Sequence, residues 1–156
     1  MNSKIKVDKF VIVVFLLCMV CNMTMQAKAY ESFKVSIYVR AYEVDKMKDI
    51  HWLDSTWNVI SQQLEVDKIY LETHRDLLVV EDATLEQAKK FFHDRGIETA
   101  GGITYTINEA NSFETFCYSN PEHRKMVQKI AEHTAKHFDE FILDDFCLLY
   151  TSPSPR

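Results

Sequence analysis

The sequence predicts an α/β fold, namely the N-terminal half (four strands, three helices) of a TIM (β/α)8 barrel. Segments with strand patterns alternate with helical segments along the chain, and this order is typical of parallel sheets with right-handed crossovers. Four strands are half the number in a barrel of ~250 residues. A small doubly wound domain fits the same pattern, but such domains usually have a fifth strand and helix. We therefore expect a truncated barrel.

Residues 1–29 have the layout of a secretory signal peptide. Lysines precede an apolar run over residues 10–20, and the small residues Ala27 and Ala29 flank Lys28. Cleavage is expected before Tyr30, which predicts a secreted or periplasmic protein. The apolar run is shorter than the ~20 residues that cross a bilayer, so no stable membrane span is expected.

Residues 147–156 read Cys-Leu-Leu-Tyr-Thr-Ser-Pro-Ser-Pro-Arg. This tail resembles a translated transposase sequencing adapter, and such additions are set aside before the fold is considered. The alternative is a genuine Ser/Pro-rich linker. We expect native sequence to end near Phe146, which leaves a partial barrel domain over residues 30–146.

The first strand and helix are predicted from alternation and capping. Residues 33–40 alternate apolar and polar side chains and are rich in β-branched and aromatic types. Asp54 or Ser55 is expected to cap a helix running to about Glu65. Its apolar face comprises Trp57, Ile60 and Leu64.

The second strand is expected at residues 68–72, followed by a polar cluster over residues 73–76. Thr84 and Gln87 have the spacing of a capping box that opens the second helix. Gly96 is expected to end that helix, because glycine adopts the left-handed conformation common after a helix.

The third strand is expected over residues 97–106 and contains Gly101-Gly102. This pair lacks the spacing of a phosphate-binding loop and indicates a bulge or close packing. The third helix is predicted to begin at Pro121 after a cap at Ser119 or Asn120. The helical histidines, His93, His133 and His137, are expected to be solvated.

The composition is acidic, with 23 Asp and Glu against 18 Lys and Arg. An acidic surface repels phosphate backbones, so no nucleic-acid partner is expected. Cys117 is the cysteine that remains between the two terminal segments, which excludes a disulfide framework within this region. We expect no cofactor and no metal.

Candidate site residues lie where the predicted strands end, because barrel active sites form at the carboxyl ends of the strands. Two adjacent carboxylates end the fourth strand, and a buried carboxylate is costly unless it is paired or functional. These are the candidate catalytic residues, Asp144 and Asp145. The polar and aromatic groups suit a carbohydrate, and the candidate substrate-binding residues are Arg40, Tyr42, Glu72, His74, Arg75 and Tyr105. The loop over residues 108–120 is expected to form a pocket wall.

Two motifs resemble a known group of enzymes. They are Phe141-Ile-Leu-Asp-Asp-Phe146 and Cys117-Tyr-Ser-Asn-Pro-Glu122. Together they resemble secreted bacterial glycoside-hydrolase barrels, loosely those of hexosaminidases with adjacent aspartates. The resemblance implies that one of Asp144 and Asp145 orients the acetamido group of the substrate, while the other protonates the leaving oxygen.

Glycoside hydrolysis requires a carboxylic acid and a negative group that supports an oxocarbenium-like transition state. Adjacent like charges raise one apparent pKa, which keeps one carboxyl protonated. Other interpretations remain. Metal-dependent polysaccharide deacetylases also use adjacent aspartates, although Phe146 replaces their following glycine and we expect no counterpart of their His-x-x-x-His helix. The domain could instead be a non-catalytic carbohydrate-binding barrel, and the Asp144-Asp145 pair could cap a following helix.

Overall fold

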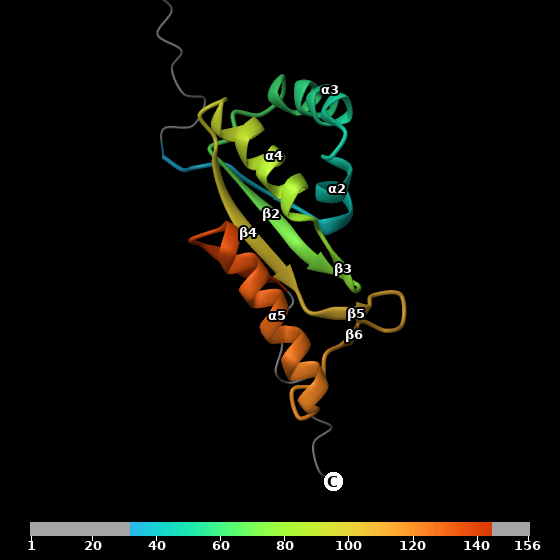
Figure 1. Ribbon diagram of the computed structural model, residues 1–156. Helices are drawn as coiled ribbons and strands as arrows, with labels where there is room; N and C mark the ends of the chain where they lie inside the picture. The colour runs from blue at the N-terminus through green and yellow to red at the C-terminus, as the bar shows by residue number, and fades with distance from the viewer. Residues whose placement is uncertain (1–31, 145–156) are drawn as a thin grey trace, which may run out of the picture.

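The computed structural model describes residues 32–144. The predicted signal peptide, Asp145 and the predicted adapter tail lie outside these residues. The elements, shown in Figure 1, are β1 (Ser36–Val39), α2 (Ala41–Lys46), α3 (Ile50–Ser61), β2 (Lys68–Arg75), β3 (Leu78–Val79), α4 (Asp82–His93), β4 (Glu98–Thr104), β5 (Thr106–Asn108), β6 (Glu114–Thr115), α5 (Pro121–His137) and β7 (Phe141–Asp144). No described helix is both long and apolar enough to cross a membrane.

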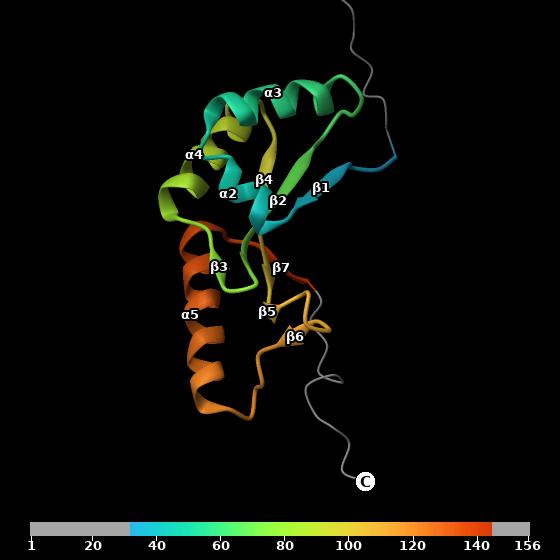
Figure 2. The ribbon, with the colours of Figure 1, turned by 90° about the vertical axis from the view of Figure 1, so that its right-hand side faces the viewer.

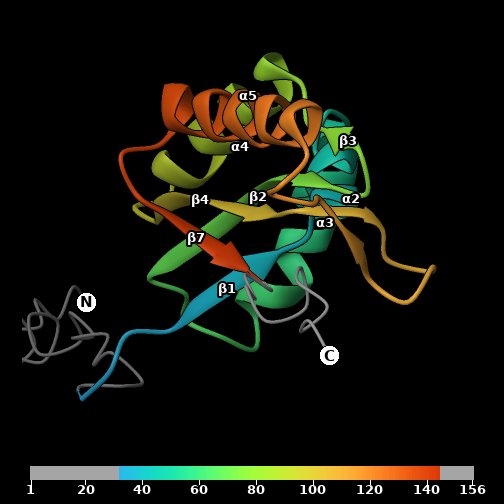
Figure 3. The same ribbon diagram turned by 90° about the horizontal axis from the view of Figure 1, so that it is seen from below.

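The main sheet has the order β1-β2-β4-β7, and these strands pair in parallel. The predicted α/β fold with a parallel sheet is therefore confirmed. The strands neighbour one another in sequence order, and Figure 3 shows them from below with α4 and α5 on one side. β3 was not predicted; it pairs antiparallel with β2 and forms a tight hairpin. β5 and β6 form a separate ribbon beyond the end of β4 (Figure 2).

The two faces of the sheet have different side chains. Ile37, Ile69 and Thr99 occupy matching positions on neighbouring strands, so their side chains share one face. Ile69 belongs to the main apolar core with Leu53 of α3 and Phe92 of α4. We call this the helical face. The opposite, polar face has Tyr38, Tyr70, Glu72, Gly102 and Thr104.

The glycine pair of β4 allows close packing on both faces. A Cβ on Gly101 would lie 2.8 Å from Cγ2 of Thr134 on α5, and one on Gly102 would lie 2.7 Å from the Tyr38 hydroxyl. Real Cβ atoms do not approach so closely, so only glycine fits without a shift. The expectation of close packing at this pair is confirmed.

The region after β1 differs from the prediction. The strand begins at Ser36, and the short helix α2 follows it directly. α3 begins earlier than expected because the Asp49 carboxylate accepts hydrogen bonds from the backbone N–H groups of His51 and Trp52. The predicted cap at Asp54 or Ser55 is therefore wrong. Leu64 lies beyond the helix and is exposed.

The predicted capping box of α4 is also wrong. Glu81 occupies the N-cap position without a side-chain hydrogen bond, and Thr84 is buried. The Gln87 side chain instead donates to the backbone carbonyls of Met47 and Lys48, at 2.7 and 3.2 Å. A tertiary contact with the end of α2 thus outweighs the local cap. Gly96 does adopt the expected left-handed conformation, with φ 74°.

The predicted start of α5 is confirmed. The Asn120 side chain accepts from the backbone N–H of Glu122, and Pro121 stands in the first turn. The long loop before α5 contains the β5–β6 ribbon, and Phe116 just after β6 is buried. The predicted fourth strand is present as β7, which includes Asp144.

Candidate functional site

A bulge in β2 creates the site. The predicted strand was too short, because β2 continues through the polar cluster to Arg75. Glu72 and His74 pair with Gly102 and Ile103, which are adjacent in β4. In a regular strand, residues three apart point to opposite faces. The extra residue of the bulge brings Glu72 and Arg75 to the same face.

Glu72 is fully buried and is surrounded by hydrogen-bond donors. Its Oε1 accepts from the Tyr38 hydroxyl at 2.9 Å and from the Thr104 hydroxyl. Its Oε2 accepts from the backbone N–H of Ala41 at 2.6 Å. Arg75 Nε and Nη2 donate to Oε2 and Oε1 at 2.9 and 3.0 Å. This bidentate pair makes Glu72 the anchor of the guanidinium.

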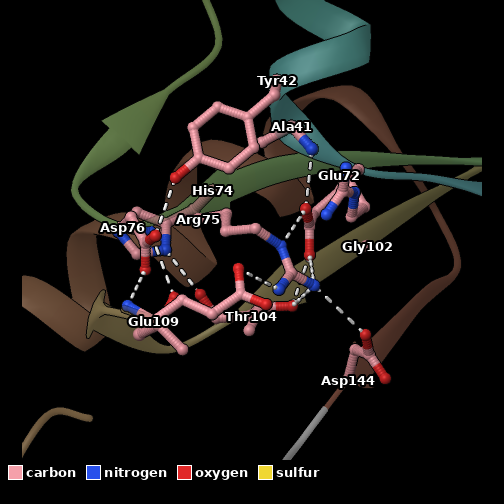
Figure 4. Close-up of polar contacts among 12 residues, drawn as sticks. Ala41, Tyr42, Glu72, His74, Arg75, Asp76, Gly102, Thr104, Glu109 and Asp144 are labelled. Atoms are coloured by element: carbon pink, nitrogen blue, oxygen red, sulfur yellow. Dashed lines mark hydrogen bonds and ion pairs between the residues drawn. The ribbon is translucent and has the colours of Figure 1, made fainter. Parts of the chain in front are cut away.

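Arg75 lies among three carboxylates, as Figure 4 shows. Besides Glu72, it reaches Oε2 of Glu109 at 3.1 Å through Nη1 and Oδ2 of Asp144 at 3.4 Å through Nη2. Only 4% of the Arg75 side chain is exposed, whereas 29% of Glu109 and 42% of Asp144 are exposed. The cation is therefore buried, and two of its carboxylate partners face solvent.

The electrostatics follow from this packing. Burial alone would lower the pKa of Arg75, but hydrogen bonds to Glu72 and Glu109, and their charges, raise it above its ordinary value. Burial and the neighbouring Glu72 carboxylate raise the pKa of Tyr38. Tyr38 and Arg75 therefore act here as fixed donors.

A second group of contacts fixes the turn after β2. The Tyr42 hydroxyl donates to Oδ2 of Asp76 at 2.7 Å, and the backbone N–H of Glu109 donates to Oδ1 at 2.8 Å. Burial opposes ionisation of Asp76, but hydrogen bonds from Tyr42 and Thr106 outweigh it and lower the pKa of this carboxyl. The Asp76 hydrogen bond raises the pKa of Tyr42 to about 12. Asp76 thereby holds the Glu109 backbone near Arg75.

The other predicted substrate-binding residues lie apart from this network. Arg40 is exposed and pairs with Glu43 at 3.4 Å. His74 is buried: its Nδ1 lies 2.7 Å from the Thr104 carbonyl, its ring contacts Phe116, and burial lowers its pKa. Tyr105 is buried in a small apolar cluster, and burial raises its pKa.

The sequence predicted Arg75 and Asp144 as site residues but did not identify Tyr38 or Glu109. Tyr38 could have been found from alternation, because it faces the same side as Glu72 in neighbouring strands. Glu109 lies at the start of the irregular loop, where the spacing of residues in the sequence does not predict which way a side chain points. The predicted partner Asp145 lies outside the described residues.

A second polar cluster lies on the helical face. Asp82, His133 and His137 offer ligand atoms that all lie within 4.8 Å of one another. The prediction of a solvated His137 is wrong, since only 4% of its side chain is exposed. The expectation that no His-x-x-x-His helix is present is also wrong, because His133 and His137 have this spacing on α5. That spacing is the sequence signal that identifies the cluster.

Comparison with known proteins identifies the family. Residues 22–154 match the family described as probable glycosyl hydrolase, catalytic domain. A protein of Saccharolobus solfataricus, named only as uncharacterized, is 31% identical over an alignment of 125 positions that covers 74% of this chain and 20% of the relative. The chain thus spans about a fifth of that relative's length. No solved structure matches significantly.

The family match covers well over half of the chain, so the chain belongs to this family of probable glycosyl hydrolase catalytic domains.

Proposed function

We propose that the polar face of the sheet, at the carboxyl ends of β2, β4 and β7, is part of a glycoside hydrolase active site. The observation that supports this proposal is the convergence of Glu109 and Asp144 on the buried Arg75. Ligands of α/β proteins bind at the carboxyl ends of parallel strands. Partly exposed carboxylates held by a buried cation suit a sugar, because sugar hydroxyls can donate hydrogen bonds to both carboxylates.

In this proposal Asp144 is the negative group that supports the oxocarbenium-like transition state. Arg75, 3.4 Å from its Oδ2, stabilises a negative charge at that position. The acid that protonates the leaving oxygen would then be Asp145. Glu72 is a positioning residue, because its oxygens are occupied by donors and its side chain is fully buried.

We further infer that the chain is the first half of a (β/α)8 barrel. Four parallel strands neighbour one another in sequence order, and side chains of α3, α4 and α5 pack on one face of the sheet. A doubly wound sheet would have helices on both faces. The small share of the Saccharolobus relative that the chain spans also supports this inference.

Secretion through residues 1–29 and a foreign tail over residues 147–156 remain part of the proposal. Resequencing the source locus across the codon for Phe146 tests the tail and the barrel together. A reading frame that continues into further strand–helix units supports both. A stop codon after Arg156 would contradict both and would favour a secreted binding domain.

The catalytic proposal is tested in the full-length protein encoded at that locus, assayed on aryl glycosides. Asp144→Asn and Asp145→Asn should each lower kcat by about 10²–10⁴-fold, the usual contribution of an acid–base group. Asp139→Asn is the matched control, because Asp139 is exposed just before β7.

Three results would contradict this assignment. Full activity in both variants would exclude the aspartate pair. Sugar binding without hydrolysis by the unmodified protein would favour a carbohydrate-binding barrel. Loss of activity with a chelator, without any fall in Tm, would favour the deacetylase interpretation, although His133 and His137 lie across the sheet from Asp144.

A further inference from the structure

The polar cluster between α4 and α5 is independent of the proposed active site. Asp82 stands in the first turn of α4, and His133 and His137 lie one turn apart on α5. α5 packs on the Gly101 side of β4, opposite the side that contacts Tyr38 and Glu72. Figure 1 shows α4 and α5 as neighbours in front of the sheet. The proposed catalytic chemistry leaves this cluster unexplained.

Two distances in the cluster are close to those between ligands of one metal ion. His133 Nδ1 lies 3.3 Å and His137 Nε2 lies 3.0 Å from the same oxygen, Oδ1 of Asp82. Ligands of a tetrahedral zinc ion at ~2.0–2.1 Å from the metal are separated from one another by about 3.3 Å. Both nitrogens therefore lie from Asp82 Oδ1 at about the separation of two ligands of one ion, and all three atoms lie within 4.8 Å of one another.

The hydrogen bonds behind the histidines orient both lone pairs toward Oδ1 of Asp82. His133 Nε2 lies 2.9 Å from the carbonyl oxygen of Val80. His137 Nδ1 lies 2.7 Å from Oε1 of Glu86. Both oxygens accept, so these nitrogens donate, and a neutral ring then has its lone pair on the other nitrogen. Metal-binding histidines are typically held in this way by a carbonyl or carboxylate.

Three possible ligand atoms thus converge in the described structure. His137 Nε2 lies at hydrogen-bond distance, 3.0 Å, from Asp82 Oδ1, so either a proton or a metal cation lies between these two atoms, because facing lone pairs would repel. Lys136 neutralises Asp82 only from the other side, through Oδ2. Its side chain is 63% exposed, so it can withdraw into solvent when Asp82 binds another cation.

We propose that Asp82, His133 and His137 bind a divalent transition-metal ion, with Zn²⁺ as the expected occupant. Two imidazoles and one carboxylate are a donor set suited to zinc and also to copper and nickel. Asp82 is half exposed, which leaves a fourth position open to water. The ion would link α4 to α5 and stabilise their packing.

The test uses the full chain without a polyhistidine tag, titrated with Co²⁺ and Zn²⁺. The expected result is one ion per chain, with the visible absorption of tetrahedral Co²⁺ and a higher Tm in Zn²⁺. Asp82→Asn and His133→Gln should each weaken binding at least tenfold. Lys136→Met should strengthen it, because the competing ammonium is removed.

The matched control is His93→Gln. His93 lies on α4 and bonds to Thr99 Oγ1 at 2.9 Å, away from the cluster, so this variant should bind as the unmodified chain does. Absence of the Co²⁺ absorption and of a Tm shift would overturn the proposal and assign the cluster to a protonated histidine between carboxylates. Equal binding in Asp82→Asn, His133→Gln and the control would also overturn it.

Discussion

The two polar clusters on opposite faces of the sheet are built on contrasting principles. On the polar face, the Glu72 carboxylate is fully buried and its hydrogen-bond partners all donate. On the helical face, Oδ1 of the half-exposed Asp82 faces two histidine nitrogens whose rings donate elsewhere. The hydrogen bonds of Glu72 are complete without a ligand, whereas Asp82 would gain from a bound cation.

This difference separates residues that maintain structure from residues that can bind. A carboxylate whose oxygens are all occupied holds its neighbours in place, and Glu72 does so for Arg75. Carboxylates that contact a fixed cation and are partly exposed can also accept hydrogen bonds from hydroxyls, which is the role proposed for Glu109 and Asp144. The sequence predicted Glu72 and Arg75 as sugar-binding residues; in the structure both are buried and paired with each other, and the partly exposed carboxylates beside them are Glu109 and Asp144.

The largest effect is expected at Glu72. In Glu72→Gln the side-chain amide would point an NH₂ group at surrounding donors and leave Arg75 with a weaker buried partner. Removing one partner of a buried ion pair costs about 3–5 kcal/mol. Urea unfolding of both proteins measures this loss.

The matched control for that variant is Glu98→Gln. Glu98 pairs with Lys34 at 3.6 Å, and its side chain is 62% exposed. An exposed pair contributes about 0–1 kcal/mol. Equal losses of stability in Glu72→Gln and Glu98→Gln would contradict the structural role of Glu72.

A second comparison uses the adjacent glycines. Gly101→Ala would press against Thr134 and Phe138 behind β4, and Gly102→Ala against the ring of Tyr38. Overpacking costs about 1–3 kcal/mol. We expect the larger loss of stability for Gly101→Ala, because a packed helix can shift less easily than a single tyrosine ring. Thermal unfolding measures both, and the reverse order would show that the polar face is the more rigid one.

The smallest effect is expected for Tyr42→Phe, which removes the hydrogen bond to Asp76. The loss should be about 1 kcal/mol or less at neutral pH, because Tyr42 is partly exposed. The pKa of Asp76 is lowered from 3.8 in the folded protein, so its interactions stabilise the fold above pH 3.8 and are lost as the pH falls below that value. Urea unfolding at several pH values should therefore show the two proteins converging in acid. A constant difference would exclude this linkage.

Much of the fold was predictable because it depends on local pattern. Alternating apolar residues identified β1, and Asn120-Pro121 identified the start of α5. The errors arose where distant contacts prevail over local ones. Gln87 has the spacing of a capping box, yet it bonds to the end of α2. The cap of α3 is Asp49, whereas the sequence predicted a cap at Asp54 or Ser55, just before the apolar face that begins at Trp57.

The sequence by itself determined the alternation of strands and helices, the acidic end of β7 and the polar segment after residue 72. Only the tertiary structure decided which of those polar residues meet. A single bulge reverses the side on which Arg75 points, and no residue type specifies it in advance. The meeting of Asp82 with His133 and His137 depends on the packing of two helices about 50 residues apart in sequence, which is a property of the folded chain.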